Sequence, residues 1–210
     1  GTATITVSAS NVFSSDVTID YATSNGTATA GSDYTAASDT LTFSAGDTSK
    51  TFTVSITDDA LDEDNETATI TISNASNGSI SDSTATLTIT DNDATPSLSI
   101  NDVSTTNESN TSTNLTVTLS AAAGRDVTVN FATSNDTATA GSDYTAASGT
   151  ATITAGQTTT TINVGVLADT TDEPNETVTI TLSNPTLASI SDATGTLTIT
   201  DDDAAPAISI

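Results

Sequence analysis

Residues 22–38 read ATSNGTATAGSDYTAAS, and residues 132–148 repeat them as ATSNDTATAGSDYTAAS, with Asp136 in place of Gly26 as the sole change. A second pair of stretches has the same offset, because SDSTATLTITDND at 81–93 returns as SDATGTLTITDDD at 191–203. Both pairs are 110 positions apart. Self-similarity at a fixed period identifies a repeat, and a period of this length is that of a whole domain. The chain therefore contains two copies of one module.

Around these stretches, apolar residues alternate with Thr, Ser or Asp at a period of two. In the first module Val17, Ile19 and Tyr21 form one such run, and Leu41 and Phe43 belong to another. This period is typical of half-buried strands. Clusters of Gly, Asn, Asp and Ser between the runs indicate turns. Six or seven short strands per module, without helical periodicity, predict an all-β fold with one antiparallel sandwich in each module.

The repeat also sets the domain boundaries that we expect. The first module covers residues 1–95 and the second residues 96–205. Residues 206–210 (PAISI) match residues 96–100 (PSLSI), so we assign them to the first strand of a following repeat or to a donated strand. Gly1 aligns with Thr111, and the opening strand of the first module is therefore missing or supplied by a preceding segment. A long tandem array would explain both ends, and so would a polymer of short chains joined head to tail by strand donation.

Charge and composition exclude several classes of function. The chain has 27 acidic residues against Lys50 and Arg125 alone, which gives a net charge of −25. Nucleic acids and anionic membrane surfaces are poor partners, because both require Lys and Arg. No apolar stretch is long enough for membrane insertion. Cys and His are absent, which removes disulfides, the usual zinc ligands and the commonest general base. We therefore do not expect an enzyme.

The acidic residues are concentrated in loops. Six lie within residues 58–66, others follow the last strand of the module at residues 91–93, and one lies in the Gly-Ser-Asp-Tyr turn; the second module repeats all three places. We expect no basic side chain to neutralise them, and two carboxylates in contact repel by roughly 4 kcal/mol at an intermediate dielectric. Calcium accepts about six to eight oxygen ligands at flexible angles. The pattern thus favours calcium sites over a merely solvated acidic face.

As a set, these motifs resemble the Calx-beta family. The matching stretches are residues 27–34 (TATAGSDY), the Gly46 turn after Phe43, the acidic run 58–66 and residues 87–93 (LTITDND), and each returns in the second module. The resemblance covers essentially the whole chain. It implies two tandem seven-stranded immunoglobulin-like sandwiches, with calcium sites in loops at one end of each.

The resemblance also implies a set of calcium ligands. In the first module these are Asp33, Asp58, Asp59, Glu63, Glu66, Asp91, Asn92 and Asp93, with the Leu61 carbonyl as a backbone candidate; in the second they are Glu108, Asp143, Asp169, Glu173, Glu176, Asp201, Asp202 and Asp203. Two departures bear on the sites. Ala168 replaces Asp58, so we expect the second module to bind fewer or weaker ions, and the first module lacks an equivalent of Glu108.

From these observations we expect a calcium-rigidified structural module of an extracellular filament, matrix fibre or adhesin stalk. An ion held at residues 91–93 would lie just before Pro96, where the next module begins. The acidic, Cys-free and Thr-rich composition fits a bacterial surface protein, with neighbouring identical modules and a cell-surface or matrix component as partners. The alternative is an adhesin module that recognises a glycan or protein surface through aromatic residues; the candidates are Tyr21, Tyr34, Phe131 and Tyr144.

Overall fold

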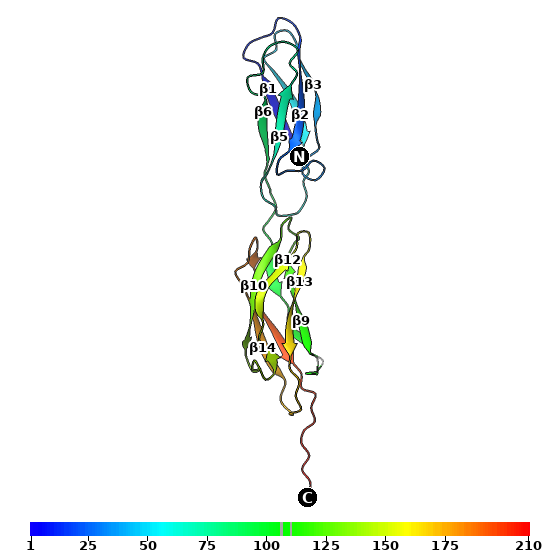
Figure 1. Cartoon of the computed structure of the whole chain (residues 1–210), viewed down its shortest axis with the longest axis vertical. Helices are drawn as coiled ribbons and strands as arrows, with labels where there is room; N and C mark the ends of the chain where they lie inside the picture. Colours follow the sequence, from blue (N-terminus) through cyan, green and yellow to red (C-terminus); the bar gives the residue numbers. More distant parts are fainter. Residues whose placement is uncertain (106, 110) are drawn as a thin grey trace. The chain divides into compact units, whose positions relative to one another are not determined.

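A computed structural model describes residues 1–105, 107–109 and 111–210. By its contacts the chain divides into two compact units: unit 1 comprises Gly1–Asp59 and Asp64–Asn92, and unit 2 comprises Ala60–Glu63 and Asp93–Ile210. All regular secondary structure in the described residues is β, and the strands form sandwiches (Figure 1). The prediction of an all-β sandwich fold is confirmed. The described part of the chain contains no helix of the length and apolarity that a membrane crossing requires.

Unit 1 has two antiparallel sheets. One sheet pairs β1 with β4, and the other has the order β3-β2-β5-β6. The alternation in the sequence determines which side chains are buried, because Val17 and Ile19 are buried whereas Thr18 and Asp20 are not. Tyr21 stacks on Phe52 with ring centroids 3.8 Å apart. The strands of unit 1 are β1 (Thr2–Ser8), β2 (Val17–Asn25), β3 (Ser38–Phe43), β4 (Ser49–Ser55), β5 (Glu66–Ser73) and β6 (Thr84–Ile89).

Unit 2 has two five-stranded sheets, with the orders β12-β10-β14-β16-β8 and β11-β13-β9-β7-β15. Two pairings are parallel, β7 with β15 and β8 with β16, which the prediction of a purely antiparallel sandwich did not include. The strands of unit 2 are β7 (Ser97–Ile100), β8 (Val103–Ser104), β9 (Ser112–Leu119), β10 (Val127–Asn135), β11 (Tyr144–Thr145), β12 (Ser148–Ile153), β13 (Thr159–Val166), β14 (Glu176–Ser183), β15 (Ser189–Ile190) and β16 (Thr194–Ile199).

The core of unit 2 is closed by its opening segment. Leu98 and Ile100 of β7 are buried in one cluster with Leu115 and Val117 of β9. In unit 1 the counterparts of Leu115 and Val117 are Ile5 and Val7 of β1, and both are only half-buried. The same sequence pattern therefore gives a more fully buried core where the opening segment is part of the unit.

The tyrosines of the Gly-Ser-Asp-Tyr turns belong to the core. Tyr34 and Tyr144 are each only 1% exposed, although the sequence had suggested positions outside it. Their hydroxyl groups donate to Asn25 Oδ1 at 2.8 Å and to Asn135 Oδ1 at 2.7 Å. A buried phenol requires such a partner, so each tyrosine anchors its turn to a neighbouring strand end.

One acidic residue of the 58–66 run pairs with a basic side chain. Asp62 is buried, and its Oδ2 accepts a hydrogen bond from Arg125 Nη2 at 2.9 Å within unit 2. The expectation that no basic side chain reaches the acidic loops was therefore wrong at this position. The physical reason is that a buried carboxylate is stable only when a partner compensates its charge.

Candidate metal centre

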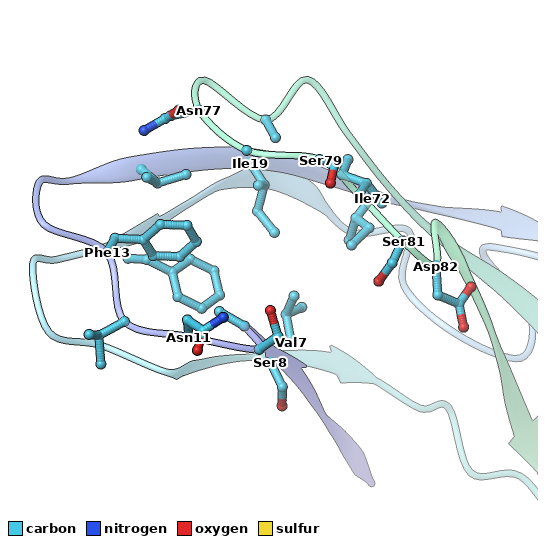
Figure 2. Close-up of a pocket in the computed structure, with 18 residues that line it drawn as sticks. Val7, Ser8, Asn11, Phe13, Ile19, Ile72, Asn77, Ser79, Ser81 and Asp82 are labelled. Carbon is cyan, nitrogen blue, oxygen red and sulfur yellow. The ribbon is translucent and has the colours of Figure 1, made fainter.

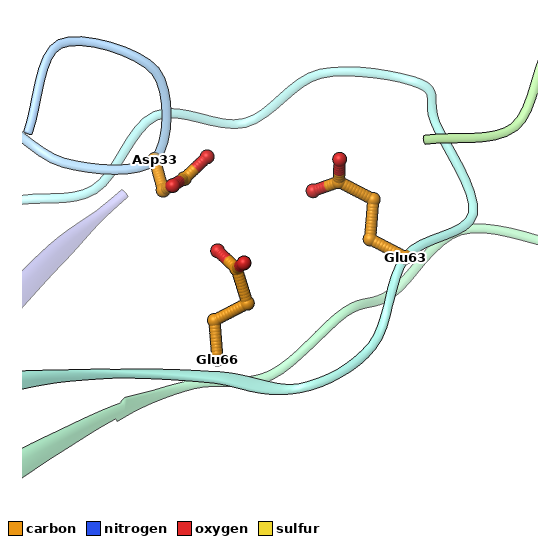
Figure 3. Close-up of side chains that lie close together, drawn as sticks. All are labelled: Asp33, Glu63 and Glu66. Atoms are coloured by element: carbon orange, nitrogen blue, oxygen red, sulfur yellow. The ribbon is translucent and has the colours of Figure 1, made fainter. Parts of the chain in front are cut away.

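Three groups of carboxylates gather in the described part of the chain. In each group, one oxygen per residue lies within 4.8 Å of the oxygens of the other members. We call them triad 1 (Asp33, Glu63 and Glu66), triad 2 (Asp143, Glu173 and Glu176) and the Glu108 group (Glu108, Asp169 and Asp203). Figure 3 shows the three carboxylates of triad 1 directed toward a common space. The members of triad 2 each follow those of triad 1 by 110 positions.

A tight turn positions the aspartate of each triad. Gly31 and Gly141 open the turns with φ values of 105° and 94°, which favour glycine. The Thr29 amide donates to Asp33 Oδ2, and the Thr139 amide donates to Asp143 Oδ2, both at 2.6 Å. One oxygen of each aspartate thus caps its own turn, and this contact fixes the direction of the whole carboxylate.

The start of a strand positions one glutamate of each triad. Glu66 and Glu176 are the first residues of β5 and β14. An asparagine precedes each of these glutamates. Asn65 Oδ1 accepts a hydrogen bond from the Asp91 amide at 3.0 Å, and Asn175 Oδ1 accepts one from the Asp201 amide at 3.1 Å. The acidic segments after the last strand of each module are thereby held beside the start of the neighbouring strand.

Unit 2 brings Glu108 to its site through the opening segment. Within this segment, β8 pairs with β16. Directly after β8, Thr105 accepts two hydrogen bonds from Thr200: its Oγ1 from the Thr200 amide at 2.9 Å, and its carbonyl from the Thr200 hydroxyl at 3.0 Å. Glu108 is 7% exposed. In unit 1 the position equivalent to Glu108 would precede Gly1. Among the described residues of the first module, triad 1 has no companion group.

The carboxylates of unit 2 repel one another when no cation is present. Burial, followed by the contact with Asp203, raises the pKa of Glu108 to about 7. Burial, followed by the contact with Asp143, raises the pKa of Glu176 to about 7. The pKa of Glu173 is also raised, first by burial and then by the charge of Asp169. These acids therefore share protons in the absence of metal, because neighbouring carboxylates cannot all ionise.

The donor set fits a hard divalent cation. Three buried oxygens in the described residues of unit 2 have no hydrogen-bond partner, namely Glu108 Oε1, Asp203 Oδ2 and Asn107 Oδ1. Buried oxygens of this kind normally have a partner. A cavity of about 10 Å³ lies among Glu108, Asp143, Asp169, Glu173, Glu176 and Asp201, close to the volume that one water-sized sphere requires. An ion with oxygen ligands would satisfy these atoms and offset the repulsion.

The other predicted ligands differ in their contacts and in their exposure. Asp201 lines the cavity between triad 2 and the Glu108 group, whereas Asp202 accepts a hydrogen bond from the Ser109 hydroxyl at 3.0 Å. In the first module, Asp58, Asp59 and Asn92 are exposed, and Leu61, Asp91 and Asp93 are half-buried. None of these eight belongs to the three groups. Two of the three groups lie in unit 2, and the expectation from Ala168 that the second module binds fewer or weaker ions stays a prediction.

The sequence analysis did not single out the residues that orient these ligands. Asn25 and Asn135 each accept two hydrogen bonds, one from a tyrosine hydroxyl and one from a turn amide. The turn amides are those of Ala30, at 2.9 Å from Asn25, and Ala140, at 3.0 Å from Asn135. Asn65 and Asn175 hold the acidic segments. Their recurrence at the same offset of 110 was the available signal. It was weak, because Asn also occurs at many other loop positions of this chain.

Comparison with protein families gives the same two-part division. Residues 1–93 and 91–203 each match the Calx-beta domain. The chain belongs to the Calx-beta family. A search of curated proteins found no match.

Solved structures match either most of the chain or about half of it. The crystal structure of CBD12 from CALX1.2 is 22% identical over 95% of this chain and 93% of that one, with a TM-score of 0.47. The crystal structure of the calcium binding domain CBD12 of CALX1.1 is 25% identical over 90% of this chain and 76% of that one, with a TM-score of 0.44. The apo-form Calx CBD1 domain covers 52% of this chain at 21% identity, with a TM-score of 0.48.

Proposed function

We propose that this Calx-beta protein is a calcium-binding, calcium-rigidified structural module of an extracellular filament, matrix fibre or adhesin stalk. One observation carries the proposal. The same three carboxylates meet in both modules, as triad 1 and triad 2, and in unit 2 the Glu108 group adds buried oxygens that have no hydrogen-bond partner. A ligand set that recurs at the same offset of 110 positions fits a bound cation better than a solvated acidic surface.

Calcium is the cation that this donor set favours. All the donors are carboxylate or amide oxygens, which hard cations prefer. The Glu and Asp side chains come from loops and strand ends, so their geometry can adapt to a high coordination number. Magnesium requires a stricter octahedron and gives up its water reluctantly. The family assignment also supports calcium, because a related structure is described as a calcium binding domain.

Calcium would stabilise each unit by joining segments that are far apart in the sequence. Triad 2 joins the turn at Asp143 to the start of β14, and the Glu108 group adds the opening segment and the segment after β16. Binding that is selective for the folded state adds about 2.7 kcal/mol when free calcium is a hundredfold above Kd. Sandwiches with few aromatic residues would depend on such a contribution to resist unfolding outside the cell.

A structural role agrees with the side chains available for recognition. The adhesin alternative requires an exposed aromatic platform, but Tyr34 and Tyr144 are buried and Tyr21 stacks on Phe52. Phe131 packs against the core of unit 2. The composition and the repeat architecture support a bacterial surface location, with identical modules following one another head to tail.

A calorimetric titration combined with thermal unfolding tests the proposal. We expect saturable calcium binding to the metal-free chain, and unfolding temperatures that rise by several degrees in calcium but much less in the same concentration of magnesium. Potassium chloride at matched ionic strength controls for screening of the net charge. Titration heats equal to the dilution blank at millimolar calcium, with identical unfolding curves in calcium and EDTA, would show that the acidic loops are only a solvated surface.

A further inference from the structure

Asn-Gly pairs occur twice in the sequence, at residues 25–26 and 77–78. The second module has Asn-Asp at residues 135–136 and Leu-Ala at residues 187–188 instead. An asparagine loses its side-chain amide most readily before glycine, because glycine leaves the backbone free to rotate and has no side chain to hinder attack by its own amide nitrogen. The structure treats the two Asn-Gly pairs differently.

Hydrogen bonds restrict the first pair. Asn25 Oδ1 accepts from the Tyr34 hydroxyl at 2.8 Å and from the Ala30 amide at 2.9 Å. Tyr34 is 1% exposed, so a rotation of the Asn25 side chain would leave a buried hydroxyl without its partner. Gly26 is also confined, because a Cβ built on it would clash with the Thr67 carbonyl oxygen. Little freedom is left for the Gly26 nitrogen to approach Asn25 Cγ.

The second pair has neither restraint. Asn77 and Gly78 are exposed, and in the described part of the chain no hydrogen bond involves the Asn77 side chain or the Gly78 amide. Figure 2 shows the Asn77 side chain on the outer side of its loop, directed away from Phe13 and Ile19. A Cβ built on Gly78 would have Phe13 Cε1 as its nearest neighbour, at 3.9 Å. The turn therefore has room to change its conformation.

The exposure of this turn does not depend on the opening segment of a module. Unit 2 includes that segment, and Leu187, at the position of Asn77, is still 41% exposed there. Among the described residues, the Ala188 amide donates to no acceptor, whereas the amide of Ser189 donates to the Pro96 carbonyl at 3.0 Å. An opening strand thus contacts the chain beyond the turn and leaves the turn itself accessible to water.

We propose that Asn77 is a site of spontaneous deamidation. The Gly78 amide nitrogen gives up its proton to water and attacks Asn77 Cγ. The bond from Cγ to the side-chain nitrogen breaks, this nitrogen leaves as ammonia, and a cyclic imide remains. Water then adds to one of the two imide carbonyl carbons and breaks its bond to the ring nitrogen. Opening at Cγ gives aspartate, and opening at the backbone carbonyl carbon gives isoaspartate, so that one water is consumed for each ammonia released.

The modification changes both the charge and the backbone of one loop. Either product has a carboxylate in place of a neutral amide, which adds one negative charge to the formal −25. Isoaspartate also leads the main chain through the side-chain carbons and lengthens the loop between β5 and β6 by one backbone atom. Ser76 fixes the start of this loop, because its amide donates to the Thr18 carbonyl and its Oγ accepts from the Thr18 amide, both at 2.9 Å. We therefore expect the change to stay local to the turn.

The inference is independent of the proposed function. Asn77 lies outside the three carboxylate groups, and its reaction requires only water. A protein that is not replaced accumulates such events with time. They would be confined to the first of the two modules, because the second has no Asn-Gly pair.

Mass spectrometry of the aged full chain tests the proposal. The chain is incubated at mildly alkaline pH and digested with pepsin; each event raises the mass of a peptide by about 1 Da, and fragmentation distinguishes isoaspartate from aspartate. Asn25 is the internal control, because it also precedes glycine. We expect Asn77 to react at least about tenfold faster than Asn25, since only Asn25 must first break hydrogen bonds. Equal rates, or a faster reaction at Asn25, would overturn the proposal.

The same incubation in denaturant shows whether the fold sets the ratio. Without the contacts of the folded chain, Asn25 and Asn77 should react at similar rates. A tenfold ratio that persists in denaturant would mean that the neighbouring residues in the sequence, and not the structure, distinguish the two sites. Asn77→Gln should abolish the mass change at this position of the folded chain, because attack on the longer side chain would form a larger and slower-closing ring.

Two variants test the role of the hydrogen bonds, with thermal unfolding as the check that each is folded. Tyr34→Phe removes one donor to Asn25 and should accelerate the reaction there several-fold while the rate at Asn77 stays unchanged. Asp136→Gly gives the second module an Asn-Gly pair whose asparagine keeps both of its donors, and this pair should react as slowly as Asn25. A reaction there as fast as that of Asn77 would show that glycine alone determines the rate and would contradict the assignment.

Discussion

The carboxyl groups of Glu108 and Asp203 contact each other in a buried part of unit 2, and each retains one oxygen without a hydrogen-bond partner. The two residues are 95 positions apart, a separation that follows from 203 minus 108. A buried pair of acids is unfavourable by itself, so it marks the place where a cation changes the stability of the fold most. Four predictions follow from this arrangement and from its equivalents.

The metal-free protein should lose stability as the pH rises from about 5 to 8. Glu108 and Glu176 have pKa values near 7 in the folded unit, above the ordinary value of 4.5. Groups of this kind favour folding while they bind protons, and that contribution disappears as the pH rises through the folded pKa. Thermal unfolding in EDTA at several pH values measures the effect. In excess calcium the trend should reverse, because ionised carboxylates bind the ion better; a metal-free unfolding temperature that increases toward pH 8 would contradict the assignment.

Replacement of Glu108 by Gln should separate calcium affinity from metal-free stability. The amide keeps the shape but removes a charged ligand, so we expect calcium affinity at unit 2 to fall at least about tenfold. In EDTA, the same variant should unfold at an equal or higher temperature at pH 8, because the repulsion from Asp203 is removed.

The matched control for this variant is Asp192→Asn. Asp192 is an exposed acid of unit 2 whose Oδ1 accepts from the Thr194 amide, and it lies outside the three carboxylate groups. Its replacement removes the same charge and should leave the calcium affinity within about twofold. Equal losses in the two variants would indicate that net charge, and not ligation by Glu108, determines the affinity.

The two triads should bind calcium independently. Glu66→Gln removes a member of triad 1, and Glu176→Gln removes the equivalent member of triad 2. Each variant should lose the binding heat of its own module and retain that of the other, as measured by calorimetric titration. Because the Glu108 group is found only in unit 2 among the described residues, we expect Glu66→Gln to leave the larger part of the total heat. Loss of all binding in either single variant would mean that the sites do not act separately.

The asparagines that orient the turns should matter more for stability than their exposure suggests. Asn135→Ala removes the partner of the Tyr144 hydroxyl and of the Ala140 amide. A buried hydroxyl left without a partner costs about 1–3 kcal/mol, which denaturant unfolding of unit 2 can resolve. Asn130→Ala is the control, because Asn130 accepts only from the exposed Thr150 hydroxyl in the described contacts and should cost less than about 1 kcal/mol. Equal costs would show that the Tyr144 contact is not responsible.

Local periodicity in the sequence was sufficient for the fold class, the two modules and the approximate positions of most strands. Alternation at period two determines which face of a strand is buried, as Val17 and Ile19 illustrate. The acidic loops were also evident, because carboxylates that recur at a fixed offset do not depend on the details of packing. The two parallel pairings were not predictable in this way, since β8 and β15 are only two residues long and have no period of their own.

The sequence by itself determined that this is a duplicated all-β protein with acidic loops in register, since these properties are encoded in residue type and spacing along the chain. Only the tertiary structure decided which acids meet. It selected Asp33, Glu63 and Glu66 from nine predicted ligands of the first module, paired Asp62 with Arg125, and brought Glu108 against Asp203. The physical reason is that coordination and charge pairing depend on distances of a few ångströms between segments that lie far apart in the sequence, and those distances are set by strand pairing and by the turns that aim each side chain.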